Sequence, residues 1–168
     1  MKENKIKKAA NPAQIKLLAC DFDGVMTNNK VIVDENGKES VICSRADGFG
    51  IELLKNKGVE VIVISKEKNK VVKARCDKLK ISYIQGINDK LSILKKELAK
   101  RSLSQEEVCF IGNDINDIEC IKYAGIGIAV NDSYPEVKKA ADIVTKKKGG
   151  DGAVREVADM IMKGIVHF

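Results

Sequence analysis

DFDGVMT, at residues 21–27, follows directly on the apolar run IKLLAC at residues 15–20. A run of this kind is typical of a central parallel strand that helices cover on both faces. In open sheets of that type, ligands bind beyond the carboxyl ends of the strands. Asp21 and Asp23 are two positions apart, so strand alternation predicts that both side chains leave on one side and Phe22 on the other.

Two neighbouring carboxylates repel each other unless a cation lies between them or one of them holds a proton. Mg²⁺ would offset the repulsion, and different surroundings would let one carboxylate act as a nucleophile and the other as an acid and base. Gly24 lets the chain turn without a side chain that crowds the site. The alternative is a strand end that is capped by solvated Asp residues. The longer string DFDGVMT favours a reactive centre.

Length and composition predict one domain. The 168 residues are 44% hydrophobic, which is enough for one core, and we expect residues 13–168 to form it behind a disordered, Lys-rich tail at 1–12. No apolar run is long enough to span a membrane and no signal peptide is apparent, so a cytoplasmic protein is expected. The first eight residues supply +3 of the formal charge of +6. With 4% aromatics and no Trp, a small anionic partner is favoured over nucleic acid.

The polar residue types exclude several kinds of catalysis. His167 is the single histidine, which argues against Ser-His-Asp hydrolysis, Cys-His proteolysis and His-rich zinc sites. The five cysteines are an odd number without a C-x-x-C pair, so they read as reduced core residues. Carboxylates, lysines, hydroxyls and a hard metal such as Mg²⁺ remain.

The rest of the chain alternates between strand-like and helix-like segments. Strands are expected at 59–64, 108–111, 126–130 and 142–144, and helices at 47–56, around 72–79 and 91–98, and at 153–165. Ser104 and Glu107 have the spacing of a capping box before the third strand. Residues 30–43 read as a β-hairpin, a flap at about 29–44. The class is α/β, a doubly wound parallel sheet of Rossmann-like type.

Three more polar positions fall where a strand should end or a helix should begin. Ser65 could donate to a phosphate oxygen or could simply cap a helix. Lys90 lies one position off the Leu91-Leu94-Leu98 stripe, so it points away from the core and reads, taken alone, as a solvated lysine. Residues 112–117, GNDIND, offer oxygen ligands that suit Mg²⁺, or an Asx-rich cap.

These motifs, in this order, resemble those of the haloacid dehalogenase-like phosphatases over nearly the whole chain. The resemblance implies that Asp21 attacks phosphorus and that Asp23 serves as the acid and base. It implies that Ser65 and Lys90 hold the phosphoryl oxygens. It also implies that Mg²⁺ binds the Asp21 carboxylate, the Asp23 main-chain carbonyl and the following cluster, from which we take Asn113, Asp114 and Asp117 as candidates. The group usually carries Gly-Asp-Asp where this chain has Gly-Asn-Asp.

With a flap in place of a cap domain, the chain is similar to a capless subgroup of these phosphatases. Members of that subgroup dephosphorylate the phosphates of 2-keto-3-deoxy sugar acids. Its members are typically homotetramers in which neighbours complete each active site, which would place residues 149–155 near an adjacent subunit's pocket. The implied substrate contacts are Arg45, Asp47, Gly48, Glu67, Arg75 and Arg155. Glu67, two positions after Ser65, favours a nine-carbon, sialic-type 9-phosphate over 3-deoxy-manno-octulosonate 8-phosphate.

Two other functions fit the same residues less well. One is a catalytically weak tetramerisation domain that is associated with a sialate cytidylyltransferase, because the Gly-Asn-Asp pattern resembles domains fused to such enzymes. The other is a phosphoacceptor switch domain. In such a domain the phosphate-accepting Asp would follow a later strand, and Asp23 would have no role. Since Asp21 and Asp23 are both present, an active enzyme is favoured.

Overall fold

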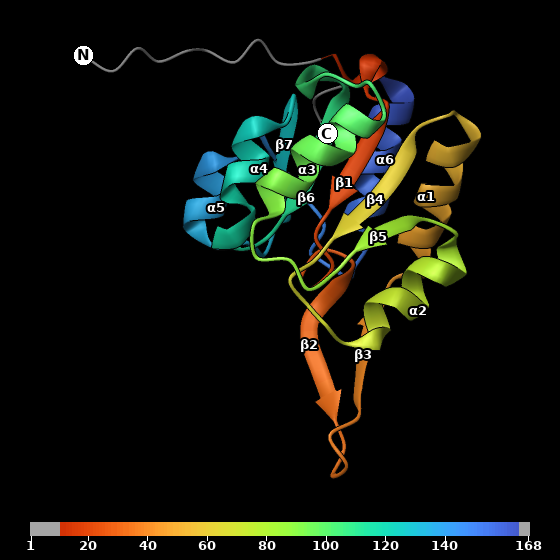
Figure 1. The fold of residues 1–168 in the computed structure, drawn as a ribbon, viewed down its shortest axis with the longest axis vertical. Coiled ribbons are helices and arrows are strands. Elements are labelled where there is room, and N and C mark those ends of the chain that lie inside the picture. The colour runs from red at the N-terminus through yellow and green to blue at the C-terminus, as the bar shows by residue number, and fades with distance from the viewer. Residues whose placement is uncertain (1–10, 165–168) are drawn as a thin grey trace.

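A central parallel sheet organises the protein, whose computed structural model describes residues 11–164 (Figure 1). Its six strands lie in the order β5-β4-β1-β6-β7-β8. Their bounds are β1 Leu17–Cys20, β4 Glu60–Ile64, β5 Ser82–Ile84, β6 Val108–Gly112, β7 Ile126–Ala129 and β8 Ile143–Val144. Strand β1 lies between β4 and β6, with Leu17 beside Glu60 on one side and Val108 on the other. The predicted parallel, doubly wound sheet is confirmed.

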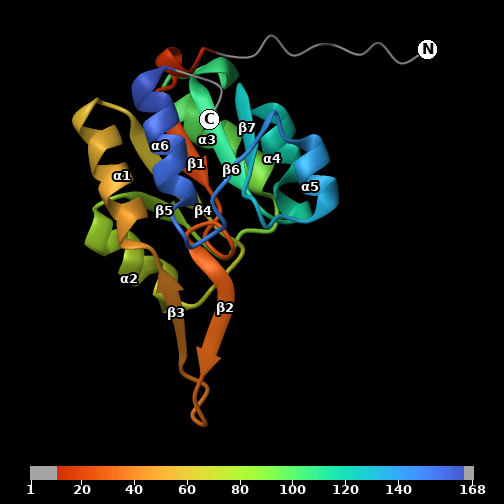
Figure 2. The same ribbon diagram turned by 180° about the vertical axis from the view of Figure 1, so that it is seen from behind.

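Helices cover both faces of this sheet. They are α1 Arg45–Asn56, α2 Lys70–Leu79, α3 Lys90–Lys100, α4 Ile118–Tyr123, α5 Pro135–Ala140 and α6 Ala153–Lys163. Figures 1 and 2, which view the molecule from opposite sides, show α1 and α6 on one face and α3, α4 and α5 on the other. Each face has its own hydrophobic cluster: Leu18 and Cys20 of β1 belong to the first, and Leu17 and Ala19 to the second. This alternation explains why β1 is apolar throughout.

Most segments that the sequence predicts are present, and two short ones were not expected. Strand β5 and helix α5 were missed. The capping box at Ser104 is confirmed, with Glu107 accepting from the Ser104 backbone. The tail boundary at residue 12 is wrong, because Pro12 is buried in a 3₁₀ helix at Pro12–Gln14. Residues 1–10 of that tail, residue 165 of the expected last helix and His167 lie outside the described residues.

No helix within residues 11–164 is both long enough and apolar enough to cross a membrane.

The predicted flap is confirmed as an antiparallel hairpin of β2 Thr27–Val33 and β3 Glu39–Cys43. Its turn is held by Asp34, whose Oδ1 accepts from the backbone N–H groups of Asn36 and Lys38, each at 2.9 Å. The hairpin extends away from the sheet, at the end where the loops that follow β1 and β4 lie (Figures 1 and 2). No cap domain is present in the described chain, so the flap is the one large projection at this end.

Asp47 joins the first turn of α1 to the first turn of α6. Its side chain is 1% exposed, and its Oδ1 accepts a hydrogen bond of 2.9 Å from the backbone N–H of Arg155. Its Oδ2 is buried without a hydrogen-bond partner among the described residues. A carboxylate placed in this way is an anchor for a helix N-terminus. The predicted substrate contact through Asp47 therefore does not hold within this chain, because solvent cannot reach its oxygens.

The same burial predicts a pH-dependent stability. Burial raises the pKa of Asp47 from its ordinary 3.8 to about 6, although hydrogen bonds from the Arg155 and Val154 backbones and the charge of Arg75 oppose the rise. The folded state therefore binds this proton more tightly than the unfolded state does, and ionisation of Asp47 lowers the free energy of unfolding above about pH 6.

Asp47→Asn removes this titration and keeps an oxygen that can accept from Arg155. Between about pH 8 and about pH 5, the free energy of unfolding of the wild type should rise relative to that of the variant by about 1.4 kcal/mol, and the full difference of about 3 kcal/mol should be reached only below about pH 4. Urea denaturation of both proteins at each pH measures the difference, in which the titration of all other groups cancels. Parallel profiles would show that Asp47 titrates at its ordinary pKa.

Candidate active site

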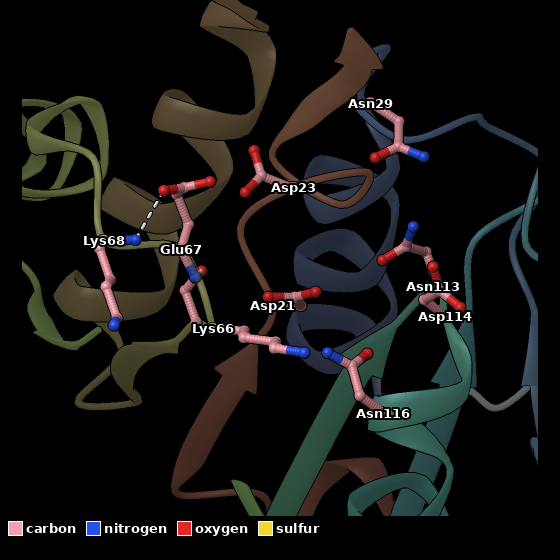
Figure 3. A pocket seen from close by; sticks show the side chains of 10 residues that line it. Asp21, Asp23, Asn29, Lys66, Glu67, Lys68, Asn113, Asp114 and Asn116 are labelled. Atoms are coloured by element: carbon pink, nitrogen blue, oxygen red, sulfur yellow. Dashed lines mark hydrogen bonds between the residues drawn. The ribbon is translucent and has the colours of Figure 1, made fainter. Parts of the chain in front are cut away.

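The site lies at the carboxyl ends of three adjacent strands. A cavity of about 410 Å³ opens there, between the loops that follow β4, β1 and β6 (Figure 3). Its lining residues are Asp21, Asp23, Asn29, Ser65, Lys66, Glu67, Lys68, Asn113, Asp114 and Asn116. Parallel strands bring their carboxyl ends to one edge, so positions far apart in the sequence meet here. The cavity thus gathers Asp21, Ser65 and Asn113, as the strand-end positions predicted.

Asp21 and Asp23 face the cavity together, and Phe22 between them is fully buried. The carbonyl of Phe22 accepts from the backbone N–H groups of Val25, Met26 and Thr27, which winds the chain into a tight turn directly after Asp21. Gly24 has φ +79°, and a Cβ at this position would lie 2.1 Å from Nδ2 of Asn113. Glycine is therefore required here both by the backbone and by the approach of Asn113.

Lys90 is buried at 2% exposure, so the expectation that it points away from the core into solvent is wrong. Its Nζ lies 2.8 Å from Oδ1 of Asp21 and 2.8 Å from Oδ1 of Asp117. The physical reason is its place as the first residue of α3, where the side chain reaches past the helix end to the ends of the strands. A buried ammonium needs anionic partners, and these two carboxylates supply them.

The ionisation of Asp21 depends on this arrangement. Burial, with the nearby Asp117, raises the pKa of Asp21 to about 7, while Lys90 and the Phe22 N–H oppose the rise. Burial alone would lower the pKa of Lys90, but the two carboxylates outweigh it and raise that pKa. Oδ1 of Asp21 accepts from both Lys90 and the Phe22 N–H, at 2.8 and 2.7 Å. Asp21 is therefore held through one oxygen, which leaves Oδ2 for a cation or an electrophile.

Asp23 has surroundings of a different kind. It is partly exposed on the cavity wall. Burial raises its pKa, the carboxylates of Glu67 and Glu39 raise it further, and Lys90 lowers it. A raised pKa favours the protonated form, which is the form that a general acid needs. The two carboxylates thus differ in their surroundings, since Asp21 is buried and held by a lysine whereas Asp23 is partly exposed; the division of roles between them stays a prediction.

Ser65 is buried at the end of β4, and the helix-cap interpretation of it is wrong. Helix α2 begins at Lys70 with Asn69 as its N-cap. The Oγ of Ser65 accepts from the backbone N–H of Glu67 at 3.1 Å, which fixes the hydroxyl at the cavity wall. Its proton remains available to an anionic oxygen in the cavity.

The loop after β6 divides its polar residues between two tasks. Asp117 is fully buried: its Oδ2 accepts from the backbone N–H groups of Asn113 and Asp114, at 2.9 and 3.3 Å, and its Oδ1 pairs with Lys90. Asn113 and Asp114 line the cavity, and Oδ1 of Asn113 is buried without a hydrogen-bond partner in the described chain. Asp117 therefore shapes the loop, while Asn113 presents a free acceptor.

These oxygens fit a hard divalent cation. The Asp21 carboxylate and the unpartnered amide oxygen of Asn113 are donors of the kind that Mg²⁺ prefers, as is the main-chain carbonyl that the resemblance assigns to Asp23. Within residues 11–164, no group of three or more His, Cys, Asp or Glu side chains is placed to hold a metal ion. Asp117, also predicted as a ligand, does not line the cavity, because both of its oxygens are engaged.

The predicted substrate contacts are mostly elsewhere. Glu67 lines the cavity, and its Oε1 accepts from the backbone N–H groups of Lys68 and Asn69. Arg155 stacks on Phe49, with 4.9 Å between its Cζ and the ring centroid, and pairs with Asp159 at 2.9 Å. Arg75 donates to the carbonyl oxygen of Ser44 at 2.9 Å, Gly48 lies against Arg75 and Leu79, and Arg45 is exposed at the start of α1.

The glycine loop before α6 packs within its own chain. A Cβ at Gly149 would lie 1.8 Å from the Gly24 carbonyl oxygen, and the Gly150 N–H donates to Val25 at 2.9 Å. This loop therefore supports the turn that carries Asp23.

Four cavity residues were not predicted: Asn29, Lys66, Lys68 and Asn116. Their signal in the sequence is proximity to the motifs. Lys66 and Lys68 follow Ser65 closely, and Asn116 falls within GNDIND. Nothing in the local pattern separates them from solvated loop residues.

Comparison with known proteins supplies the family. The model of the haloacid dehalogenase-like hydrolases matches residues 64–157. A 3-deoxy-D-manno-octulosonate 8-phosphate phosphatase, KdsC of Yersinia pestis, is 37% identical over 158 residues, which cover 94% of this chain and 83% of the relative. The crystal structure of the phosphatase of that name from Yersinia pestis superposes with a TM-score of 0.89 at 36% identity, covering 91% of this chain and 83% of that one.

The phosphatase of the same name from Moraxella catarrhalis, solved in complex with a magnesium ion, a phosphate ion and KDO, is also similar. It superposes with a TM-score of 0.89 at 33% identity and covers 98% of this chain and 94% of that one. The matched segment includes Ser65, Lys90 and the loop after β6, and the relatives extend the likeness over the strand that ends at Asp21. The chain belongs to the haloacid dehalogenase-like hydrolases.

Proposed function

We propose that this protein is a Mg²⁺-dependent phosphatase of a 2-keto-3-deoxy sugar acid phosphate, and that 3-deoxy-D-manno-octulosonate 8-phosphate is its substrate. The observation that carries the proposal is the contrast between Asp21 and Asp23 on one wall of the cavity. Asp21 is buried and held by Lys90 at 2.8 Å, whereas Asp23 is partly exposed on the cavity wall. The names of the relatives from Yersinia pestis and Moraxella catarrhalis support the substrate.

The reaction takes two displacements at phosphorus. Asp21 attacks through its free carboxylate oxygen, a phosphorus–oxygen bond forms, and the bond to the sugar oxygen breaks as Asp23 gives that oxygen its proton. Ionised Asp23 then takes a proton from water, whose oxygen attacks the aspartyl phosphate. Phosphate leaves, and the Asp21 carboxylate is restored. Lys90 keeps the nucleophile oriented throughout, and Ser65 donates to a phosphoryl oxygen.

The metal would be held by Asp21, Asp23 and Asn113, with Asp114 at the rim. When bound, it offsets the repulsion between the carboxylates and the anionic substrate and clamps the transferring group. Support comes from the unpartnered Oδ1 of Asn113 and from the relative that was solved with a magnesium ion.

One residue, Glu67, favours a different candidate substrate, a sialic-type 9-phosphate. The sequence alone favoured a sialic-type 9-phosphate because of Glu67, yet the relatives carry the name of the eight-carbon substrate. Glu67 does line the cavity, where a longer sugar acid could reach it. Its hydrogen bonds to the Lys68 and Asn69 backbones also give it a local structural task, so the nine-carbon substrate ranks second.

The test is phosphate release from both sugar acid phosphates with Mg²⁺, by wild type and Asp21→Asn. The eight-carbon substrate should give the higher kcat/KM, and the variant should lose roughly 10³-fold or more of kcat because the nucleophile is gone. Removal of Mg²⁺ with a chelator should also abolish turnover. A preference for the nine-carbon substrate would reverse the ranking.

If neither compound is hydrolysed faster by wild type than by Asp21→Asn, the enzyme proposal fails. The catalytically weak tetramerisation domain would then be the better description. A stable phosphorylated form with negligible turnover would instead favour the phosphoacceptor switch.

The flap supports a homotetramer in which neighbouring subunits complete the site. Its apolar side chains are exposed, at 50% for Val31, 61% for Ile32, 57% for Val33 and 56% for Ile42. A two-stranded ribbon with apolar residues open to water on this scale is typical of a surface that another chain covers. Arg45, exposed at the start of α1, would then be placed to meet a neighbour's substrate.

Ile32→Lys should break this assembly, because it would bury an unpaired charge in the interface. Light scattering after size-exclusion chromatography should show a mass up to about fourfold lower than that of the wild type. Asn36→Lys adds the same charge in the turn of the flap and should leave the mass unchanged. A wild type that is monomeric at micromolar concentration would contradict the proposal.

A further inference from the structure

The geometry assigns a substrate-binding role to Lys66, whose ammonium group would bind the oxygens of the phosphoryl group directly. This inference deepens the proposed phosphatase function and rests on it. The role had been expected of Lys90, which the structure commits to other partners. Nothing in the sequence pattern distinguishes Lys66 from a solvated loop lysine, so the assignment depends on its place in the cavity.

Lys90 is held inside the site by two carboxylates. Its Nζ lies between Oδ1 of Asp21 and Oδ1 of Asp117, at 2.8 Å from each, and 2% of the residue is exposed. It is absent from the lining of the cavity. Two of its three ammonium donors are therefore engaged within the protein. Its charge acts on the site through Asp21.

Lys66 spans the cavity above the nucleophile. It follows Ser65 at the end of β4, whereas Asn116 belongs to the loop after β6, and these two strands flank β1 on opposite sides. Figure 3 shows the Lys66 side chain extending past Asp21 toward Asn116. An incoming phosphorus atom must approach Asp21 from the cavity, so its oxygens would enter the reach of this ammonium group.

The neighbouring Lys68 points elsewhere. It also lines the cavity and is exposed, but in Figure 3 its side chain turns away from Asp21. Its Cγ is 3.5 Å from the place that a Cβ on Gly86 would take, so its stem lies over the loop after β5. The two lysines therefore carry the same charge, are both exposed and belong to the same loop. Their side chains point in different directions.

The charge of the cavity calls for a cation at this place. Four lining carboxylates, those of Asp21, Asp23, Glu67 and Asp114, face a phosphate monoester that carries nearly two negative charges at neutral pH. Among the described residues that line the cavity, Lys66 and Lys68 are the cations. A lysine ammonium has three donors on a flexible stem, so it can follow the phosphoryl group from substrate to product.

Direct binding of inorganic phosphate tests the assignment without turnover. Isothermal titration calorimetry would compare wild type, Lys66→Met, Lys66→Arg and Lys68→Met, each with and without Mg²⁺. Lys66→Met should weaken binding about 5- to 10-fold, since it removes a charge-assisted hydrogen bond. Lys66→Arg should stay within about twofold of the wild type, because the cation is kept. Lys68→Met, the matched control, should change the affinity by less than about twofold.

Equal losses in the two methionine variants would mean that only the general charge of the loop matters, and would overturn the assignment. No loss in Lys66→Met, or no measurable binding by the wild type, would overturn it as well. The proposed function fails separately. If phosphate binding depends on Lys66 but neither sugar acid phosphate is hydrolysed, the substrate is wrong and the role of Lys66 stands. If a sugar acid phosphate is hydrolysed while Lys66→Met binds phosphate normally, the reverse holds.

Discussion

The buried ammonium group of Lys90 is the interaction on which the active end of the sheet depends. It joins the start of α3 to the end of β1 through Asp21, and to the loop after β6 through Asp117. Loss of one partner from such a group would leave an uncompensated buried charge, which is far more costly than the intact contact is stabilising. The contacts of Lys90 also fix the orientation of the two carboxylates. Asp117 is turned to the backbone of its own loop, and Asp21 keeps one oxygen for the cavity.

The sheet could be predicted because its central strand is covered on both faces, so every residue of β1 is buried and apolar. The two missed elements lack such a signal. Strand β5 has three residues, begins with Ser82 and lies at the edge of the sheet. Helix α5 has six residues and one buried side chain, that of Val137. Periodicity cannot be read from fewer than two turns of helix or from a strand this short.

The candidate site divides in the same way. Asp21, Ser65 and Asn113 could be predicted to meet, because a parallel sheet brings the ends of its strands to one edge. The direction in which each side chain points could not be predicted from the sequence. Lys90 could be placed at the site only through the family resemblance; taken alone it read as a solvated lysine, since its burial depends on how α3 lies over the strand ends. Asp47 was expected at the substrate, but it holds the backbone of Arg155, which is 108 positions away. Contacts between helices at this separation leave no mark in a local pattern.

The amide of Asn113 changes the charge of the cavity and of the candidate metal site. A third carboxylate in its place would add to the repulsion between Asp21 and Asp23, whereas an amide oxygen offers an acceptor without a charge. A metal ion at this site would have one anionic ligand fewer than with a carboxylate at position 113, which would weaken its binding. A cation must then rely on Asp21, yet Lys90 and the Phe22 N–H already hold Oδ1 of that carboxylate. In the proposed mechanism, a metal ion and Lys90 would share Asp21 through different oxygens, so the geometry of this one side chain would limit both the affinity for the cation and the direction of attack.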